Sequence, residues 1–411
     1  MDWTRRNAFA LAASALAAAG AAAQVSDDAL RIGVLADMNG LYSDLSGAGS
    51  VAAAQMAAAD FGGSVLGRRI EVVSADHQNR PDIGANIARR WIDREGVDVI
   101  VDVPVSSIAF AIQEITRAKN RAFLISSSGA SDLTGRACSP VSVHWTYDTY
   151  ALAHALGGAL LERGADSWFF ITADYAFGHA LERDAMAVVR ARGGRVLGAV
   201  RHPQDTADFS SYLLQARASG ARVIALANAG GDTVNAIKQA NEFGVARTQQ
   251  VVGLLTYISD VHSLGLQHAQ GLLLASAFYW DMDDETRAWT RRFLAQVNRV
   301  PTMANAGVYG AVLHYLKAAA AAGTDDAARV VRAMKDLPID DFFTKGGSVR
   351  EDGRVMRNIY LFQVKAPAES RYRFDYYRLL ATVPAERAFR PLAEGGCRLA
   401  TGAAGRPGGA P

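Results

Sequence analysis

The sequence predicts an α/β protein with two Rossmann-like lobes, each built on a parallel sheet and joined by a hinge of more than one crossover. Short apolar runs alternate with longer segments of helical periodicity from about Leu30 onwards, which is typical of parallel strands and crossover helices. The alternation begins again near residue 167. The 411 residues, 50% of them hydrophobic, suffice to fill two cores.

In the first half of the chain, strands are expected where short apolar runs end in turn residues. These runs span residues 31–38, 69–76, 97–105 and 122–126. Helices are expected between them, and the clearest begins at Pro81, a residue favoured in the first helical turn. Ile83, Ile87 and Trp91 share one face of that helix, as a helix packed on a sheet requires.

The second half repeats this pattern after a helix expected from about Tyr147 to Arg163. Strands are expected at 167–173, 195–200, 222–229, 249–256, 272–280 and 358–364, with helices over 285–297, 305–321 and 326–337 among the later ones. The economical interpretation is a chain that returns to its first lobe. It gives a first lobe of residues 28–146 with 273–356 and a second lobe of 147–272 with 357–395. Such lobes can close on a ligand by hinge motion.

Residues 1–23 have the organisation of a secretory signal peptide. Arg5 and Arg6 precede an apolar stretch, which ends in small residues up to Ala23. A membrane anchor is the alternative, but it needs about 20 strongly apolar residues and this stretch is short and rich in alanine. We therefore expect a soluble protein outside the cytoplasm, with the export route left open. The Gly, Ala and Pro-rich tail at 401–411 is expected to be disordered.

Two cysteines, Cys138 and Cys397, are the only ones in the chain. An even pair in a secreted protein is typically bridged, so we expect one disulfide. The alternative is two unrelated thiols.

Charge and motifs exclude several classes of function. The formal charge of +2 gives no field that would concentrate nucleic acid. No glycine-rich phosphate-binding turn follows a strand, and no GxSxG motif occurs. The eight histidines are scattered and do not have metal-ligand spacing. We expect neither a cofactor nor a metal.

Serine-rich turns follow two successive predicted strands. Ser106 follows the third strand, and Ala130 and Ser131 lie in the loop after the fourth. Serines at such places are often plain helix caps and turn residues. Since ligands of open α/β sheets bind at the carboxyl ends of strands, two such turns could converge on one ligand carboxylate.

Other candidates lie in further strand-end loops. Tyr42, Tyr175 and Tyr279 could stack on an apolar ligand, although tyrosines there also pack in cores. Asn228 and Asp232 follow the strand at 222–229, where Asp232 could cap a helix or bind ligand.

In order and spacing, several segments resemble periplasmic solute-binding proteins of branched-chain amino-acid ABC transporters, which have type I periplasmic-binding topology. The segments are GVLADMNGLYSDLSGAGS (33–50), VPVSS (103–107), LISSSGASDLTG (124–135), DYAFG (174–178) and AGVYGAVLHYL (306–316). The resemblance covers about residues 30–380. It implies a non-enzymatic, monomeric periplasmic receptor, which captures a small carboxylated solute between its lobes and presents it to a membrane permease.

The resemblance also assigns roles to particular residues. It places the ligand carboxylate on Ser106 and on Ala130 with Ser131, and it carries over a first-loop tyrosine to Tyr42. Tyr175 and Asp232 lie near binding positions of the second lobe.

Amino-acid binders of this family hold the ligand ammonium with an acidic residue after the strand that corresponds to VVGLL. Leu254 and Leu255 stand about there, and a buried ammonium without a carboxylate is unfavourable. Segments 143–151, 227–240 and 276–281 look like the branch associated with aromatic carboxylic acids.

An aromatic acid is therefore the expected ligand, and a branched-chain or other amino acid is the alternative. An alternative of another class is a secreted α/β hydrolase, with Ser106 or Ser128 as nucleophile and His77 or His144 as base.

Overall fold

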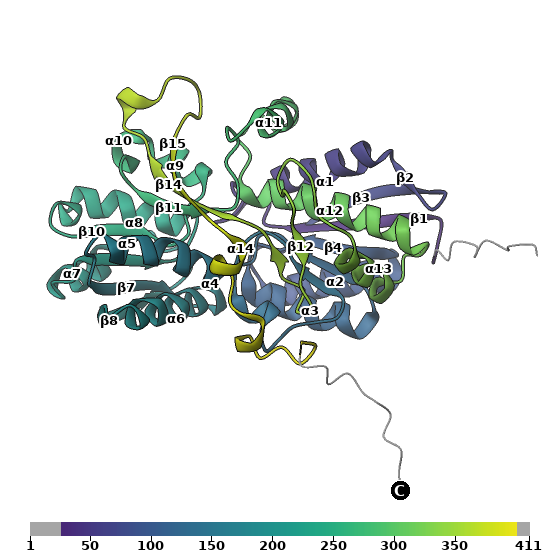
Figure 1. Ribbon diagram of the computed structural model, residues 1–411, viewed down its shortest axis with the longest axis horizontal. Coiled ribbons are helices and arrows are strands. Elements are labelled where there is room, and N and C mark those ends of the chain that lie inside the picture. The colour runs from purple at the N-terminus through teal and green to yellow at the C-terminus, as the bar shows by residue number, and fades with distance from the viewer. Residues whose placement is uncertain (1–25, 401–411) are drawn as a thin grey trace, which may run out of the picture.

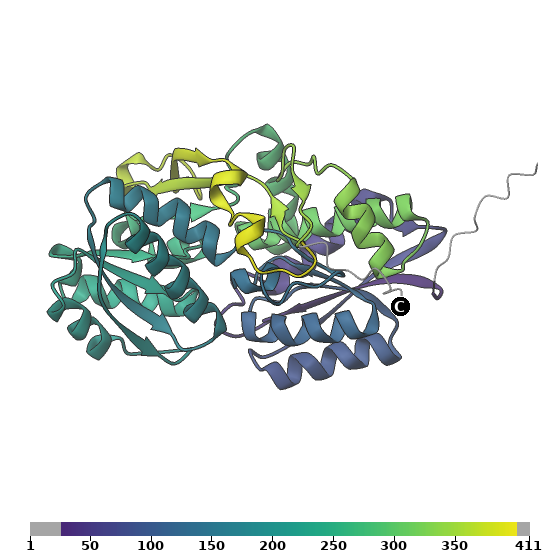
Figure 2. The same cartoon turned by 60° about the horizontal axis from the view of Figure 1, so that its bottom comes forward.

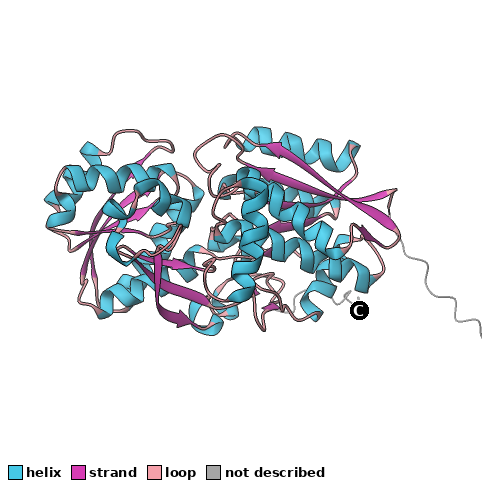
Figure 3. Cartoon of the chain, turned by 90° about the horizontal axis from the view of Figure 1, so that it is seen from above, coloured by secondary structure: helices cyan, strands magenta, loops and turns pink. Residues whose placement is uncertain are grey.

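The computed structural model describes residues 26–400 and has two α/β lobes that lie side by side (Figure 1, Figure 2). Helices flank the strands in each lobe (Figure 3). The expected signal peptide at 1–23 and the expected tail at 401–411 lie outside the described residues. Within the described part, no helix has the length and apolarity to span a bilayer.

A six-stranded sheet forms the centre of the first lobe, in the order β2-β3-β1-β4-β5-β6. The strands are β1 (Ala29–Ala36), β2 (Ser64–Val65), β3 (Arg68–Asp76), β4 (Val97–Asp102), β5 (Ala122–Ile125) and β6 (Ser142–His144), and the helices α1 (Gly47–Phe61), α2 (Pro81–Arg94) and α3 (Ser106–Lys119) connect them. All pairs are parallel except β2 with β3. Every residue of β4 is buried, including the carboxyl groups of Asp98 and Asp102.

The second lobe has a four-stranded parallel sheet in the order β10-β9-β7-β8. Its strands are β7 (Ser167–Ala173), β8 (Arg195–His202), β9 (Val223–Ala227) and β10 (Gln250–Gly253), and its helices include α6 (Ala176–Ala191), α7 (Ser210–Ala218), α8 (Gly231–Glu242), α9 (Ile258–Leu264) and α10 (Leu266–Ala269). The predicted pattern of alternating strands and helices is thus confirmed in both lobes.

The helix expected from Tyr147 to Arg163 is divided. It consists of α4 (Thr149–Leu152), a π-helical turn η2 (Ala153–Gly157) and α5 (Gly158–Glu162). Hydrophobic periodicity does not detect a single wider turn, so the sequence indicated one uniform helix.

The last third of the chain contributes helices and strands to both lobes. Helices α11 (Asp284–Val297), α12 (Met303–Ala322) and α13 (Ala327–Asp336) and the hairpin β12 (Ser348–Val349) with β13 (Val355–Met356) lie with the first lobe (Figure 1). Strands β11 (Leu273–Ser276), β14 (Ile359–Val364) and β15 (Tyr377–Val383) form an antiparallel sheet beside β10. The strand β15 and the hairpin were not predicted.

Within residues 26–400 the chain connects the lobes four times, and the first three connections form the hinge. The first follows β6, the second follows β11 and the third runs from Arg354 through β13 to β14. Arg354 and Arg357 of the third connection are both buried. Arg354 Nη1 donates to the backbone oxygen of Tyr147 in the first connection over 2.9 Å, and Arg357 Nη2 donates to that of Ala277 in the second, also over 2.9 Å. The third connection therefore holds the other two.

After β15 the chain passes through α14 (Ala385–Ala388) back to the first lobe. There Cys397 forms a disulfide with Cys138, as predicted. Phe389 is buried along this segment, with its ring 4.7 Å from the guanidinium carbon of Arg354. The segment from α14 to Cys397 is thus both packed and covalently attached beside the hinge.

Candidate ligand-binding site

A narrow cavity of about 10 Å³ lies between the lobes. Its wall comprises Tyr42, Leu45, Pro104 and Ser127 from the first lobe, Tyr147 from the first connection, and Tyr175, Phe177, Ala229, Leu255 and Tyr257 from the second lobe. That is about the space of one water molecule, so a larger solute requires the lobes to move apart.

The wall is built from the carboxyl ends of parallel strands. Pro104 follows β4 and Ser127 follows β5, while Tyr175, Ala229 and Leu255 follow β7, β9 and β10. Helices α3, α6 and α8 begin within two residues of these positions. Their N-termini carry partial positive charge and free N–H groups, which favours an anionic ligand group. No lining side chain is charged.

Four tyrosines of the wall form two hydroxyl pairs across the cavity. The hydroxyl oxygens of Tyr42 and Tyr175 are 2.8 Å apart, and those of Tyr147 and Tyr257 are 2.5 Å apart. Burial raises the pKa of all four phenols. They therefore remain protonated at neutral pH and act as neutral hydrogen-bonding groups.

The predicted residues Ser106 and Ala130 lie together beside Pro104. Ser106 is fully buried, and its Oγ accepts a hydrogen bond from the backbone N–H of Ala130 over 3.2 Å. Among residues 26–400, no group accepts the Ser106 hydroxyl proton, although neither Ser106 nor Ala130 lines the cavity itself.

The structure directs Ser131 to an interlobe contact instead. Its hydroxyl donates to Asp184 of α6 over 2.7 Å, and Asp184 also accepts from Thr149 over 2.6 Å. Next to it, Arg183 forms a 2.6 Å ion pair with Asp132 of the first lobe. These contacts form a clasp between the lobes, which we define as Ser131, Asp132, Arg183 and Asp184.

Asn228 and Asp232 support loops of the second lobe. The Asn228 amide oxygen accepts from Thr233 over 2.7 Å, and Asp232 accepts from the backbone N–H groups of Asp205 and Thr206. Burial raises the pKa of Asp232 to about 7. Neither residue lines the cavity.

Tyr279 lies in the core of the second lobe. Its ring packs against Phe362 and Tyr377, and its hydroxyl donates to the backbone oxygen of Phe374 over 3.2 Å. The structure does not bring Tyr279 to the cavity.

Sequence reasoning missed Tyr147, Phe177 and Tyr257 as lining residues. Ser127 also lines the cavity, two residues after β5, in the serine-rich turn whose hydroxyls the sequence offered as ligand contacts. Its hydroxyl donates to the buried carboxylate of Asp102, which also accepts from Ser46 over 2.5 Å. Burial raises the pKa of Asp102. One carboxylate therefore joins the two first-lobe loops that carry Tyr42 and Ser127.

The backbone is strained at this point. Asp102 and Val103 have φ angles of 85° and 58°, a region that residues other than glycine rarely occupy. Such strain clusters at functional sites, where the surrounding structure enforces it.

The groups of a hydrolase do not come together. Ser128 Oγ donates to the backbone oxygen of Val103, and His144 Nε2 lies 2.7 Å from the backbone oxygen of Ser128 rather than from its hydroxyl. His77 Nδ1 accepts from the backbone of Asn79. The part of the chain that the structure describes also holds no group of three or more potential metal ligands.

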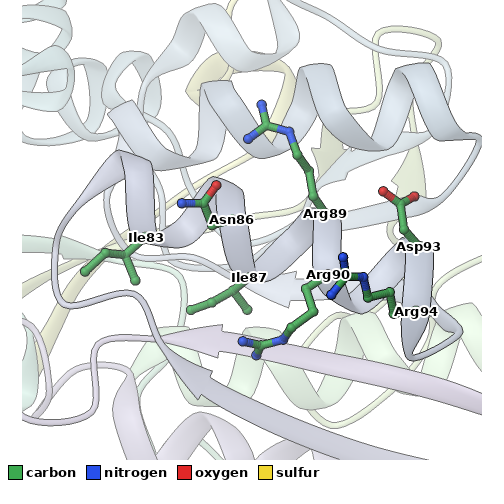
Figure 4. Close-up of a pocket in the computed structure, with 7 residues that line it drawn as sticks. All are labelled: Ile83, Asn86, Ile87, Arg89, Arg90, Asp93 and Arg94. Carbon is green, nitrogen blue, oxygen red and sulfur yellow. The ribbon is translucent and has the colours of Figure 1, made fainter.

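A more open hollow lies along α2 (Figure 4). It is lined by Ile83, Asn86, Ile87, Arg89, Arg90, Asp93 and Arg94, all from this one helix. Since no second element contributes, the interlobe cavity remains the better candidate site.

The comparison with known families decides the class of protein. A family model described as periplasmic binding protein matches residues 29–370. The chain belongs to the periplasmic binding protein family. The predicted resemblance is thereby confirmed, and the family implies a small-molecule ligand and the permease of an ABC transporter as partners. The family also favours a periplasmic location.

Solved structures of similar proteins agree with this family. A periplasmic binding protein from Burkholderia mallei is 47% identical to this periplasmic binding protein, with a TM-score of 0.89 over 90% of this chain and 99% of its own. A branched-chain amino-acid ABC transporter periplasmic ligand-binding protein from Burkholderia xenovorans LB400 is 40% identical, with a TM-score of 0.81 over 90% and 100% of the two chains.

A more distant structure shares the fold alone. It is an ABC-transporter solute-binding protein from Rhodopseudomonas palustris BisB5 in complex with 3,4-dihydroxybenzoic acid. It is 20% identical to this periplasmic binding protein, with a TM-score of 0.78 over 87% of this chain and 98% of its own.

Proposed function

We propose that this periplasmic binding protein captures a small aromatic carboxylic acid in the interlobe cavity and presents it to the permease of an ABC importer. The observation that carries the proposal is the composition of the cavity wall. Four tyrosines and Phe177 surround a small space in which no side chain is charged. Aromatic rings favour a flat apolar ligand body through stacking and edge contacts.

The wall disfavours a free amino acid because nothing on it would neutralise an ammonium group. Leu255 lies in the cavity near the position where amino-acid binders of the family have an acidic residue. An ammonium buried against leucine would lose its hydration without gaining an ion pair. A neutral ring at this place has no such penalty.

A carboxylate, in contrast, has suitable partners. The N-termini of α3, α6 and α8 face the cavity region, and the Ser106 hydroxyl keeps a free proton beside Pro104. Hydrogen bonds to a charged group contribute more than neutral ones, about 1.5–3 kcal/mol each. We assign the carboxylate to Ser106 and neighbouring backbone N–H groups, including Ala130, and the ring to Tyr42 and Tyr175.

The remaining predicted residues have supporting roles in this proposal. Ser131 belongs to the clasp that holds the closed lobes together. Asn228 and Asp232 position loops of the second lobe, and Tyr279 stabilises its core. We further propose that residues 1–23 act as a cleaved export signal and that the mature protein works as a monomer.

A single experiment separates the two candidate ligand classes. The mature protein is unfolded, dialysed and refolded to remove carried-over solute, and its melting temperature is then measured with benzoate, with leucine and with valine. A ligand at about 100 times its Kd stabilises the fold by about 2.7 kcal/mol, which is a clear melting shift. Stabilisation by benzoate without stabilisation by either amino acid supports the proposal.

Branched-chain amino acids remain the second candidate because the Burkholderia xenovorans relative, at 40% identity, has that description. Leu45 and Leu255 could contact an aliphatic side chain. A melting shift with leucine or valine, and none with benzoate, would favour this second function and reject the first.

A further inference from the structure

The two tyrosine pairs of the cavity differ in the number of hydroxyl protons that remain free for a ligand. We infer that the pair Tyr42–Tyr175 donates to the ligand, whereas the pair Tyr147–Tyr257 can only accept, so that the site selects an aromatic acid that also carries a hydroxyl group. This inference rests on the proposed function and specifies its ligand class further.

In the pair Tyr147–Tyr257 both protons are already used. The Tyr147 hydroxyl donates to the backbone oxygen of Ser127 over 2.5 Å. Since a phenol has one proton, the 2.5 Å contact between the two hydroxyls requires Tyr257 to donate to Tyr147. Tyr257, which lines the cavity, therefore offers the ligand only the lone pairs of its oxygen. The complementary ligand group is a hydrogen-bond donor.

In the pair Tyr42–Tyr175 one proton remains free. The two hydroxyls share one hydrogen bond, which uses one of their two protons. The other polar partner, the Gln204 amide nitrogen at 3.2 Å from the Tyr42 oxygen, is itself a donor and consumes none. Whichever tyrosine donates within the pair, one phenolic proton is left for a ligand acceptor. Together with the free Ser106 proton, it suits a carboxylate.

The acceptor pair is fixed from two directions. Asp102 holds the Ser127 hydroxyl, and Ser127 in turn supplies the carbonyl that takes the Tyr147 proton. The backbone oxygen of Tyr147 accepts from the buried Arg354. The Ser127 hydroxyl and the Tyr147 backbone oxygen are thus both held by other residues. This keeps the hydrogen bonds of the Tyr147–Tyr257 pair in one preorganised direction.

The hydrogen-bond donor that complements the Tyr257 oxygen must belong to the ligand and be uncharged. An ammonium group would be a donor too, but no lining carboxylate would compensate its charge. A phenolic hydroxyl satisfies Tyr257 without burying a cation. Hydroxybenzoates therefore match both pairs, whereas benzoate leaves Tyr257 without a partner, which is unfavourable in a buried site.

Calorimetric titration of refolded protein with benzoate, 3-hydroxybenzoate, 4-hydroxybenzoate and 4-methoxybenzoate tests this inference. We expect one hydroxybenzoate isomer to bind about tenfold more tightly than benzoate, as one well-formed hydrogen bond implies. The methoxy compound has no proton to donate and should show no gain. In Tyr257→Phe the advantage of the hydroxyl should fall to within about twofold.

Tyr212→Phe is the matched control, because Tyr212 packs against Phe209 and His202 outside the cavity and should leave all four affinities unchanged. Equal binding of benzoate and both hydroxybenzoates, or an advantage that survives in Tyr257→Phe, would overturn the inference while leaving the proposed function intact. If none of the four acids binds, the proposed function fails, and the inference fails with it.

Discussion

Arg354 donates a hydrogen bond to the backbone oxygen of Tyr147 over 2.9 Å, which attaches a buried cation of the third connection to the first. The same guanidinium lies 3.6 Å from the carboxylate of Asp148, whose other oxygen caps α4 through the N–H of Ala151. The side chain of Tyr147 reaches the cavity from this anchored backbone. The hinge and the binding site therefore share one residue.

Arg354→Met should lower the free energy of unfolding by about 3 kcal/mol, because it leaves Asp148 and the Tyr147 carbonyl buried without their cation. Urea denaturation followed by circular dichroism measures this loss. Arg195→Met is the control, since Arg195 is 68% exposed and lies 3.8 Å from Asp166. The control should change stability by less than about 0.5 kcal/mol. Equal effects of the two substitutions would contradict the role assigned to Arg354.

The clasp between the lobes should contribute to affinity without touching ligand. Arg183→Met removes the ion pair with Asp132, and we expect the Kd for the bound acid to rise up to about fivefold through weaker closure. Arg192→Met removes a pair with Glu162 inside the second lobe and should leave the Kd unchanged. Calorimetric titration measures the Kd of both variants. Indistinguishable Kd values for the two would show that the clasp does not contribute to affinity.

Leu255→Asp places a carboxylate in the cavity wall and should weaken benzoate binding about a hundredfold or more at pH 8, because two like charges would then share a buried site. Leu255→Met conserves apolar character and should keep the Kd within about threefold of the wild type. Calorimetric titration measures both. Undiminished benzoate affinity in the aspartate variant would show that the ligand lies elsewhere.

Asp98 should make stability depend on pH. Burial raises its pKa to about 7, because one carboxylate oxygen has no partner and the single hydrogen bond from the Arg31 N–H, which lowers the pKa, does not offset the lost hydration. In the unfolded chain this carboxyl ionises near its ordinary pKa of about 3.9. Between those two values the folded state binds more protons, so stability is greatest at low pH and falls as the pH rises.

Asp98→Asn removes this titration. The unfolding free energy of the variant minus that of the wild type should increase by about 1 kcal/mol per pH unit from pH 4 to 7. Above pH 7 it should stay constant. Urea titrations at several pH values supply the difference. A difference that is constant over this range would contradict a raised pKa for Asp98.

The disulfide between Cys138 and Cys397 spans 259 residues of sequence. A loop of that length corresponds to roughly 5 kcal/mol in the chain-entropy model, and measured gains are typically about 2–4 kcal/mol. The double variant with serine at both positions should lose an amount in this range, and dithiothreitol should destabilise the wild type but not the variant. Two reactive thiols in unreduced wild-type protein would contradict the bridge.

Most of the fold could be predicted because its central strands are buried on both faces. Runs such as β4 and β7 are rich in apolar residues, fully buried and bounded by turn residues, so local pattern suffices. In contrast, Tyr377 is the one buried residue of β15, and within residues 26–400 this strand pairs only with β14. Nothing in its local pattern indicates that pairing.

The site was predictable only where a local signal existed. Tyr42 and Tyr175 line the cavity from loops after strands, as expected. Tyr279 also follows a strand, but β11 pairs with β14 in a separate sheet, which directs the side chain into the core. Tyr147 reaches the cavity because distant Arg354 and Ser127 fix its position, and such long-range contacts leave no pattern in the sequence.

The disulfide also closes the chain into a covalent ring that runs from Cys138 to Cys397 and contains the second lobe. A protease that cleaves one exposed loop within this ring would produce two fragments that stay joined until they are reduced. Non-reducing electrophoresis would therefore show an intact band for a nicked protein. In a compartment with many proteases, the receptor could lose one peptide bond and still keep both halves of its binding site together.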